Sequence, residues 1–158
     1  MKKPNILFIL LDDMGWKDLA CTGSTFYETP NIDRLSREGM SFTNAYASCP
    51  VCSPSRASFL TGKYPARLGL TDWIDMDGTC HPLRGRVIDA PYVKHIPEGE
   101  YTVAQALRDG GYAAWHVGKW HLGGEAYYPD KEGFDVNIGG CSWGHPHQGY
   151  FAPYGIET

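Results

Sequence analysis

The sequence predicts an α/β fold with a mainly parallel sheet flanked by helices. Three segments support this prediction: an apolar run at residues 6–11, a capped helix at residues 102–110 and a strand pattern at residues 112–118. Strands that alternate with helices are typical of parallel sheets, because each helix carries the chain back to where the next strand begins. With 158 residues, the chain is long enough for one domain with a sizeable core.

The N-terminal part of the chain contains two predicted strands and one helix. Residues 6–11 are all apolar, lie between a proline and an aspartate pair, and predict a buried parallel strand. Residues 29–39 predict a helix, since Thr29 can cap it, a proline follows at the first position and a glycine can end it. Residues 40–46 alternate apolar and polar side chains, which favours a second strand.

A short helix is predicted directly after Cys52. Ser53 can serve as its N-cap, Pro54 suits the first helical position, and Gly62 stands where a left-handed C-cap residue is favoured. Cys52 is therefore expected at a helix N-terminus, where unpaired backbone N–H groups and the helix dipole favour negative charge.

The other predicted elements follow a long irregular segment. Residues 63–100 are rich in proline, glycine and charge and predict little regular structure. Thr102 then begins the capped helix that Gly110 ends, and the strand pattern of residues 112–118 comes next. From residue 123 onward the sequence has no periodicity and predicts loops.

Composition and charge exclude several classes of function. The hydrophobic content of 42% and charged content of 20% are typical of a soluble globular protein. The 14 basic and 18 acidic residues are scattered, so we expect neither nucleic acid nor a membrane as a partner. Two lysines precede the apolar run at 6–11, but the run is too short for a signal peptide or a membrane span. We therefore expect a cytoplasmic protein, or a periplasmic or secreted one if a leader was removed.

The five cysteines are open to two interpretations. They are Cys21, Cys49, Cys52, Cys80 and Cys141, and their odd number fits either free thiols in a reducing compartment or one special cysteine with two disulfides. Two residues separate Cys49 from Cys52, but the intervening proline and the helix start argue against a zinc site.

Two clusters of candidate site residues stand at the ends of predicted elements. Arg56 lies one helical turn after Cys52, close enough to reach back toward the same point. Lys119 and His121 follow the strand at 112–118, where lysine can hold an anionic oxygen and histidine can exchange a proton. Taken alone, the two residues would be better explained as a surface lysine and a structural histidine. His116 alternates with the pocket side and is expected to pack within the strand.

Two adjacent carboxylates form a third cluster. Asp12 and Asp13 follow the strand at 6–11, and ligand sites of open α/β sheets lie outside the carboxyl ends of the strands. Their mutual repulsion is relieved by a cation, and hard oxygen ligands suit Ca²⁺ or Mg²⁺. A solvated strand end or a helix cap is the alternative interpretation of the pair.

Together these residues indicate an enzyme that acts on an oxygen-rich anion such as a sulfate or phosphate ester. A thiol phosphatase is disfavoured, because such enzymes place five residues between cysteine and arginine and need no metal carboxylates. Only three residues separate Cys52 from Arg56 here.

At four places the sequence resembles the formylglycine-dependent sulfatases of the alkaline phosphatase superfamily. Residues 52–62, Cys-Ser-Pro-Ser-Arg-Ala-Ser-Phe-Leu-Thr-Gly, are similar to the first signature of that family. Residues 111–121, Gly-Tyr-Ala-Ala-Trp-His-Val-Gly-Lys-Trp-His, are similar to the second. Residues 4–13 and 29–35 resemble the N-terminal pattern of the family. The resemblance covers nearly the whole chain and implies an alkaline-phosphatase-like fold.

The resemblance implies that the nucleophile is not the thiol itself. Cys52 would be oxidised to formylglycine by a maturating enzyme that reads Pro54 and Arg56. The hydrated aldehyde carries two hydroxyls, one to attack sulfur and a second to expel sulfate. A plain serine ester could not release the group in this way, because it has no second oxygen.

The resemblance also implies roles for the other site residues. Asp12, Asp13 and the modified Cys52 would ligate Ca²⁺ (or Mg²⁺), which holds a sulfate oxygen. Arg56 would orient the diol. Lys119 would clamp the sulfate, and His121 would take the proton of the second hydroxyl.

Members of this family are considerably longer, and they take further metal ligands from downstream segments. Residues 1–158 therefore resemble the N-terminal portion of a sulfatase catalytic domain, with the fold and the metal site incomplete. His145 could line the substrate pocket or belong to a plain loop. The implied activity is hydrolysis of sulfate monoesters, with a sulfated carbohydrate as the expected substrate. A phosphonate or phosphodiester hydrolase with the same site, or a non-catalytic fragment, are the alternatives.

Overall fold

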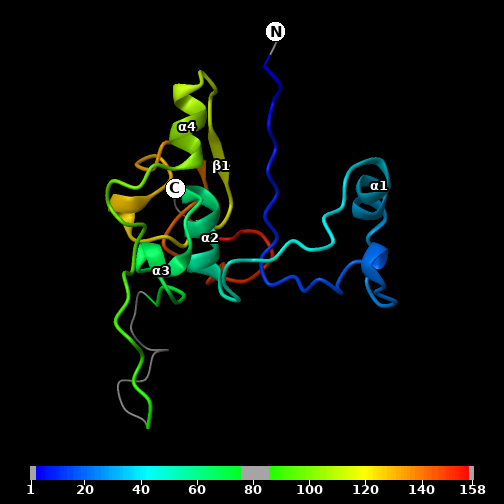
Figure 1. Ribbon diagram of the computed structural model, residues 1–158, viewed down its shortest axis with the longest axis horizontal. Helices are drawn as coiled ribbons and strands as arrows, with labels where there is room; N and C mark the ends of the chain where they lie inside the picture. The colour runs from blue at the N-terminus through cyan, green and yellow to red at the C-terminus, as the bar shows by residue number, and fades with distance from the viewer. Residues whose placement is uncertain (1–2, 76–85, 157–158) are drawn as a thin grey trace. The chain divides into compact units, whose positions relative to one another are not determined.

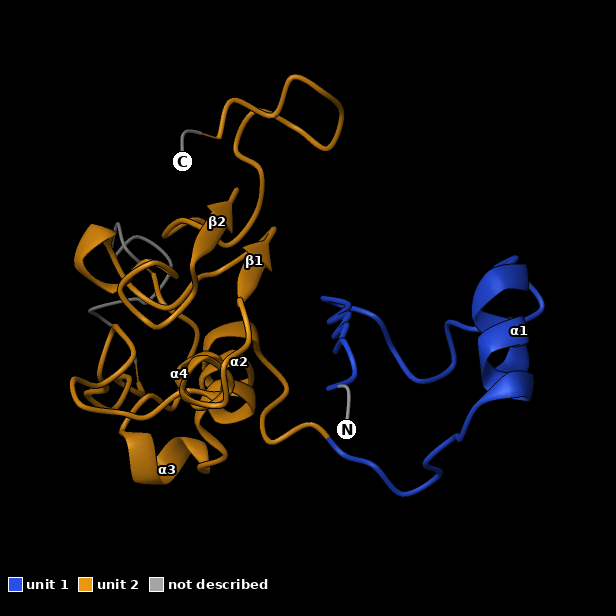
Figure 2. Cartoon of the chain, turned by 90° about the horizontal axis from the view of Figure 1, so that it is seen from above, with its two compact units in different colours: residues 1–46 blue, residues 47–158 orange. Residues whose placement is uncertain are grey.

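The structure is a computed structural model that describes residues 3–75 and 86–156. It divides into two compact units, residues 1–46 (unit 1) and 47–158 (unit 2), which Figure 2 distinguishes by colour. None of the helices in the described ranges is long and apolar enough to cross a membrane.

Unit 1 contains a 3₁₀ helix, η1 (Ala20–Thr22), and one α-helix, α1 (Pro30–Glu38). The helix predicted at 29–39 is thus confirmed, with Pro30 in its first turn. The Thr29 hydroxyl accepts a hydrogen bond from the Ala20 N–H (2.9 Å) and donates one to the Asp33 carboxylate (2.9 Å). This second bond is the main reason that the pKa of Asp33 is lowered. Thr29 therefore joins η1 to α1.

The strands predicted at residues 6–11 and 40–46 are not formed. Both segments lie outside the strands of the described chain, and Figure 1 draws residues 6–11 as an extended trace without an arrow. The side chains of residues 6–11 are between 46% and 85% exposed. A strand needs a neighbour to pair its backbone groups, and the described residues of unit 1 include no strand that could serve. An apolar run alone does not supply that neighbour.

Unit 2 contains a two-stranded parallel sheet with helices beside it (Figure 1). Strand β1 (Trp115–Val117) pairs with β2 (Val136–Ile138), and His116 stands opposite Asn137. The parallel pairing agrees with the predicted class, although β1 is shorter than the range 112–118. Neither β2 nor the 3₁₀ helix η2 (Glu125–Tyr127) was predicted, because three-residue elements among glycines leave no periodic pattern.

The hydrophobic core of unit 2 lies beneath helix α2 (Cys52–Thr61). A second helix, α3 (Pro65–Leu68), packs beside α2 and comes from the segment predicted to be irregular. The core combines apolar side chains of these helices with those of two later segments, namely Ala57, Leu60, Leu68, Leu70, Ile74, Ile96, Trp120 and Leu122. The chain that follows β1 is therefore anchored in the same core as α2.

Helix α2 begins two residues earlier than predicted. Its N-cap is Val51, so Cys52 is the first helical residue and Ser53 lies inside the first turn. The prediction that Ser53 caps the helix was therefore wrong, and its buried hydroxyl accepts a hydrogen bond from the Ile74 N–H (3.0 Å) instead. Gly62 ends the helix in the left-handed conformation with φ 68°, as predicted.

Helix α4 (Val103–Asp109) starts with a complete capping box. The Thr102 hydroxyl accepts from the Gln105 N–H (3.2 Å), while the Gln105 side chain accepts from the Thr102 N–H (2.8 Å). The same hydroxyl donates to the Glu132 carbonyl (2.7 Å), and Thr102 is only 1% exposed. The cap thus joins α4 to the loop before β2.

Thr102→Ala should therefore lower the free energy of unfolding by about 1–3 kcal/mol, because it removes a cap and leaves a buried carbonyl without its donor. Denaturant titration measures this change. Thr102→Ser keeps the hydroxyl and serves as the control. Equal losses for the two variants would show that the methyl group, and not the capping hydroxyl, stabilises this end of α4.

Candidate active site

Cys52 is the first residue of α2, and it is partly buried. The sequence predicted this position at a helix N-terminus, and the structure confirms it. The first backbone N–H groups of an α-helix have no partner within the helix, and they favour an anion at this end. A negatively charged group bound beside Cys52 would therefore meet a favourable field.

Arg56 connects α2 to the segment that follows β1. Its Nη1 atom donates a hydrogen bond to the backbone carbonyl of Lys119 at 2.5 Å, across 63 residues of sequence. This contact brings the two signature segments, residues 52–62 and 111–121, side by side. The guanidinium is therefore fixed between Cys52's helix and the chain that carries Lys119 and His121.

His121 is buried, with 3% of its surface exposed. Its Nε2 atom lies 2.8 Å from the carbonyl oxygen of Ile74, and its N–H donates to the Cys141 carbonyl at 3.1 Å. The residue has a φ of 60°, in the left-handed region that residues with side chains rarely adopt. The backbone N–H is thus bonded to Cys141 while the residue has a strained backbone conformation, and Ile74 contacts the ring.

His116 packs inside β1, as the sequence predicted. Its ring meets the rings of Trp120 and Phe134 edge to face, at centroid distances of 5.1 and 5.5 Å. Burial lowers the pKa of His116, and the positive charge of Arg56 lowers it further. The ring is therefore neutral at physiological pH and adds no positive charge to the site.

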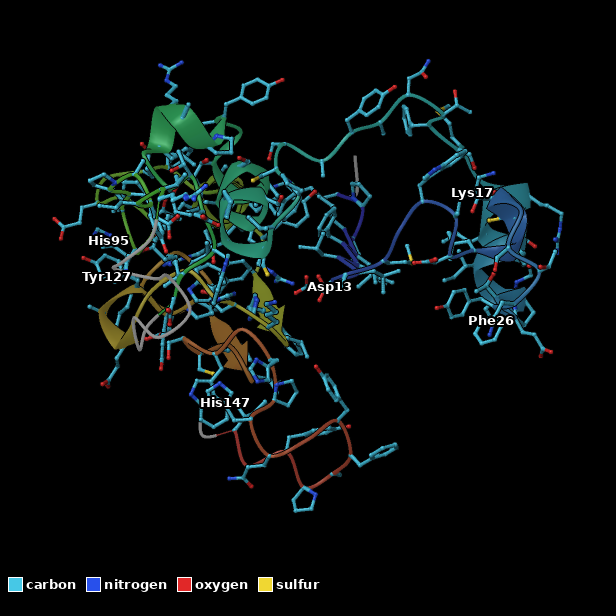
Figure 3. All side chains as sticks on the ribbon, turned by 90° about the horizontal axis from the view of Figure 1, so that it is seen from below. Asp13, Lys17, Phe26, His95, Tyr127 and His147 are labelled. Carbon is cyan, nitrogen blue, oxygen red and sulfur yellow. The ribbon has the colours of Figure 1, made fainter. Side chains whose placement is uncertain are left out.

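Three further predicted site residues, Asp12, Asp13 and His145, come from other parts of the sequence. Asp12 and Asp13 are exposed residues of unit 1, and Asp13 has a φ of 53°. Their closeness to Cys52 remains a prediction. His145 is an exposed residue of unit 2, and its ring lies 4.7 Å from that of His147, which stacks on Trp143 (Figure 3 labels Asp13 and His147).

The described residues do not form a complete metal site. In the ranges 3–75 and 86–156, no group of three or more His, Cys, Asp or Glu side chains is placed to hold a metal ion. Asp12 and Asp13 supply carboxylate oxygens of the kind that Ca²⁺ prefers, but Ca²⁺ takes six to eight oxygens. The pair therefore fits part of a donor set.

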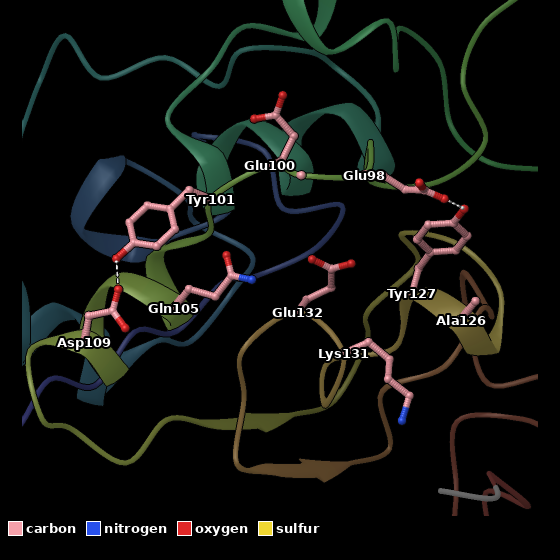
Figure 4. A pocket seen from close by; sticks show the side chains of 10 residues that line it. Glu98, Glu100, Tyr101, Gln105, Asp109, Ala126, Tyr127, Lys131 and Glu132 are labelled. Carbon is pink, nitrogen blue, oxygen red and sulfur yellow. Dashed lines mark hydrogen bonds between the residues drawn. The ribbon is translucent and has the colours of Figure 1, made fainter.

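A cavity of about 630 Å³ lies elsewhere on unit 2, between the start of α4 and η2. Figure 4 shows its carboxylates: Glu98 accepts from the Tyr127 hydroxyl (3.4 Å) and Asp109 from the Tyr101 hydroxyl (2.5 Å). Burial raises the pKa of a third carboxylate, that of Glu132. An acidic lining repels anions, so this cavity suits an anionic substrate less well than the N-terminus of α2 does.

Comparison with known proteins places the chain in a family. The family model "Sulfatase" matches residues 4–148, which is most of the chain. The chain belongs to the sulfatase family. The resemblance noted in the sequence is therefore confirmed.

The curated relatives of this sulfatase chain are much longer than it is. It is 42% identical over 152 residues to N-acetylgalactosamine-6-sulfatase of Sus scrofa and 41% identical to that of Homo sapiens. Each alignment covers 96% of this chain and 27% of the relative. Steryl-sulfatase of Mus musculus is 39% identical over 145 residues, covering 87% of this chain and 22% of the relative. The chain thus spans about a quarter of the length of the relatives it matches.

Two solved structures have the same fold as this sulfatase chain. The crystal structure of Ps i-CgsB superimposes with a TM-score of 0.68 and 36% identity, covering 85% of this chain and 27% of that one. A sulfatase structure from a study of glycosaminoglycan metabolism in Bacteroides thetaiotaomicron gives a TM-score of 0.65 and 37% identity, with coverages of 87% and 28%. These neighbours confirm the predicted α/β, alkaline-phosphatase-like class.

Sequence reasoning missed two residues that shape the sulfatase site. Ile74 contributes only backbone groups, which any residue type could supply, so its identity gave no signal. Gly144 packs against the imidazole of His121, and a Cβ atom there would lie 2.7 Å from the ring. A glycine beside a cluster of histidines and aromatic residues was the one sign of such a close approach.

The partly buried His116 predicts a loss of stability in acid. Its pKa is lowered from about 6.5, so the unfolded chain binds a proton at a higher pH than the folded chain does. The free energy of unfolding should therefore fall as the pH is lowered through about 6.5 toward the folded pKa.

Denaturant titrations between pH 8 and about 5 measure this slope. His116→Gln should flatten it, because the variant has no group that titrates at this position. His147→Gln, which removes an imidazole at an exposed position, is the matched control. An unchanged slope in His116→Gln would show that another group causes the loss in acid.

Proposed function

We propose that this chain carries part of the active site of a sulfatase that hydrolyses sulfate monoesters, with Cys52 oxidised to formylglycine. The observation that carries the proposal is the hydrogen bond from Arg56 to the Lys119 carbonyl. It joins the helix that begins at Cys52 to the segment that holds Lys119 and His121. Membership of the sulfatase family supports the same reaction.

Each side chain in this group has one proposed task. Once oxidised and hydrated, Cys52 supplies two hydroxyls on one carbon, one to attack sulfur and one to expel sulfate. The guanidinium of Arg56 is already held by the Lys119 carbonyl. Its charge therefore offsets that of the attacking oxygen without a rearrangement of the side chain. The ammonium group of Lys119 holds a sulfate oxygen, and the imidazole of His121 takes the proton of the second hydroxyl.

Burial of the first signature bears on how Cys52 is modified. Ser53 and Pro54 are fully buried in the folded chain, and Arg56 is engaged with Lys119. A maturating enzyme that reads Pro54 and Arg56 could not reach them there. We infer that it acts before unit 2 folds.

The substrate is proposed to be a sulfated carbohydrate, with His145 lining its pocket. The relatives named N-acetylgalactosamine-6-sulfatase support this class of substrate. Asp12 and Asp13 are proposed to contribute carboxylates to a site for Ca²⁺ (or Mg²⁺), with the modified Cys52 as a further ligand. The described residues hold only part of a donor set for this ion.

The modification of Cys52 is tested by mass spectrometry of the peptide that contains it, in protein from a host competent for the reaction. An aldehyde in place of the thiol is expected, together with sulfate release from an aryl sulfate by the full-length protein. Cys52→Ala should lower that release by more than about a thousandfold, as loss of a nucleophile does.

The control is an aryl phosphodiester assayed in parallel. Faster turnover of the phosphodiester would favour a phosphodiester hydrolase with the same site. An unmodified thiol in a competent host would contradict the formylglycine mechanism directly.

The metal proposal is tested by calorimetry with Ca²⁺ on the 158-residue chain. Two carboxylates are too few for tight binding, so a Kd of about 1 mM or weaker is expected. Asp13→Asn should reduce the heat further, whereas Asp130→Asn, at an exposed carboxylate of unit 2, should not. Submicromolar binding that survives Asp13→Asn would show that the chain holds a different, complete site.

A further inference from the structure

Ile74 connects the two signature segments through its backbone. Its N–H donates to the Ser53 hydroxyl at 3.0 Å, and its carbonyl oxygen lies 2.8 Å from Nε2 of His121. All three residues are buried: Ser53 is 0% exposed, Ile74 2% and His121 3%. One residue from the segment between the signatures thus bridges the first turn of α2 and the proposed proton acceptor.

The contact with Ile74 determines which nitrogen of His121 carries a hydrogen. A carbonyl oxygen can only accept a hydrogen bond, so Nε2 must be the donor in this pair. In the neutral imidazole the other nitrogen, Nδ1, is then the one that can accept a proton. The bond therefore selects one tautomer of the ring.

Gly144 restricts the same ring from another side. A Cβ atom at this position would lie 2.7 Å from Cε1 of His121 and 3.1 Å from both ring nitrogens. The ring thus lies close against a backbone that has no side chain, and this backbone limits its turning toward Gly144. The carbonyl of Ile74 and the backbone of Gly144 together leave the imidazole a single orientation.

We propose that Ser53 and Ile74 are positioning residues for His121. The Ser53 hydroxyl holds the Ile74 peptide, and the carbonyl of that peptide fixes the Nε2–H tautomer and the ring orientation of His121. Neither residue touches substrate in this proposal. Its kinetic consequence rests on the proposed function of His121, whereas the tautomer and the hydrogen bonds are properties of unit 2 alone.

The test uses Ser53→Ala in the full-length protein labelled with ¹⁵N-histidine and ¹⁵N-isoleucine. Without the serine oxygen, the amide of Ile74 should exchange with solvent about tenfold faster, the factor for one lost hydrogen bond. The ¹⁵N shifts of His121 should then show a mixture of tautomers in place of one. In an aryl sulfate assay kcat should fall about tenfold with KM unchanged, since proton transfer and not binding is affected.

Two controls separate this role from general damage to α2. Ser58→Ala makes the same atomic change on the same helix, but the buried Ser58 hydroxyl has no hydrogen-bond partner in the described structure. It should leave the signals of Ile74 and His121 unchanged. Ser53→Thr keeps a hydroxyl and should restore the single tautomer.

Gly144→Ala perturbs the imidazole ring of His121 directly. The added methyl displaces the ring of His121 and should disturb its tautomer, while the Ile74 amide keeps its protection from exchange because Ser53 is intact. This variant keeps the proposal testable if Ser53→Ala does not fold.

Three results would decide against the proposal. The first is a single tautomer of His121 in both Ser53→Ala and Gly144→Ala. The second is equal exchange of the Ile74 amide in Ser53→Ala and the parent protein. The third is that Ser58→Ala changes the Ile74 and His121 signals as Ser53→Ala does. If the parent protein releases no sulfate, the proposed function fails, but the nuclear magnetic resonance results still decide whether Ser53 and Ile74 position His121.

Discussion

The hydrogen bond between the Arg56 guanidinium and the Lys119 carbonyl is the contact on which the site depends. A charged donor makes such a bond stronger than one between neutral groups, and here it joins segments 63 residues apart. Both of its ends are firmly supported. Arg56 belongs to α2, whose Ala57 and Leu60 are buried, and Lys119 is followed by Trp120, which is 2% exposed and donates from its indole to the Tyr127 carbonyl (2.7 Å).

The charges around this contact favour an anion. The N-terminus of α2 presents backbone N–H groups beside Cys52, and Arg56 lies one turn further along the helix. His116 would add a like charge next to Arg56, but its burial and the guanidinium itself lower its pKa and keep it neutral. The acidic cavity beside α4 has the opposite character.

Local signals predicted three helices, α1, α2 and α4, whereas strand pairing and long-range hydrogen bonds depend on residues distant in the sequence. The N-cap of α4, Thr102, could be predicted because its capping box is complete within four residues of sequence. The apolar run at 6–11 carries the composition of a buried strand, but pairing depends on a neighbour that composition does not specify. Ser53 shows the same limit within the site. Its sequence neighbours favoured a cap, whereas its hydroxyl accepts from Ile74, 21 residues away.

Four hydrogen bonds within unit 2 order the candidate site residues. Arg56 bonds to Lys119, Ser53 and His121 share Ile74, and the Cys141 carbonyl accepts from the N–H of His121. Within unit 2, backbone groups of Ile74, Cys141 and Gly144 thus contact His121 and restrict its ring and backbone, and none of the three contributes a side-chain polar atom to do so.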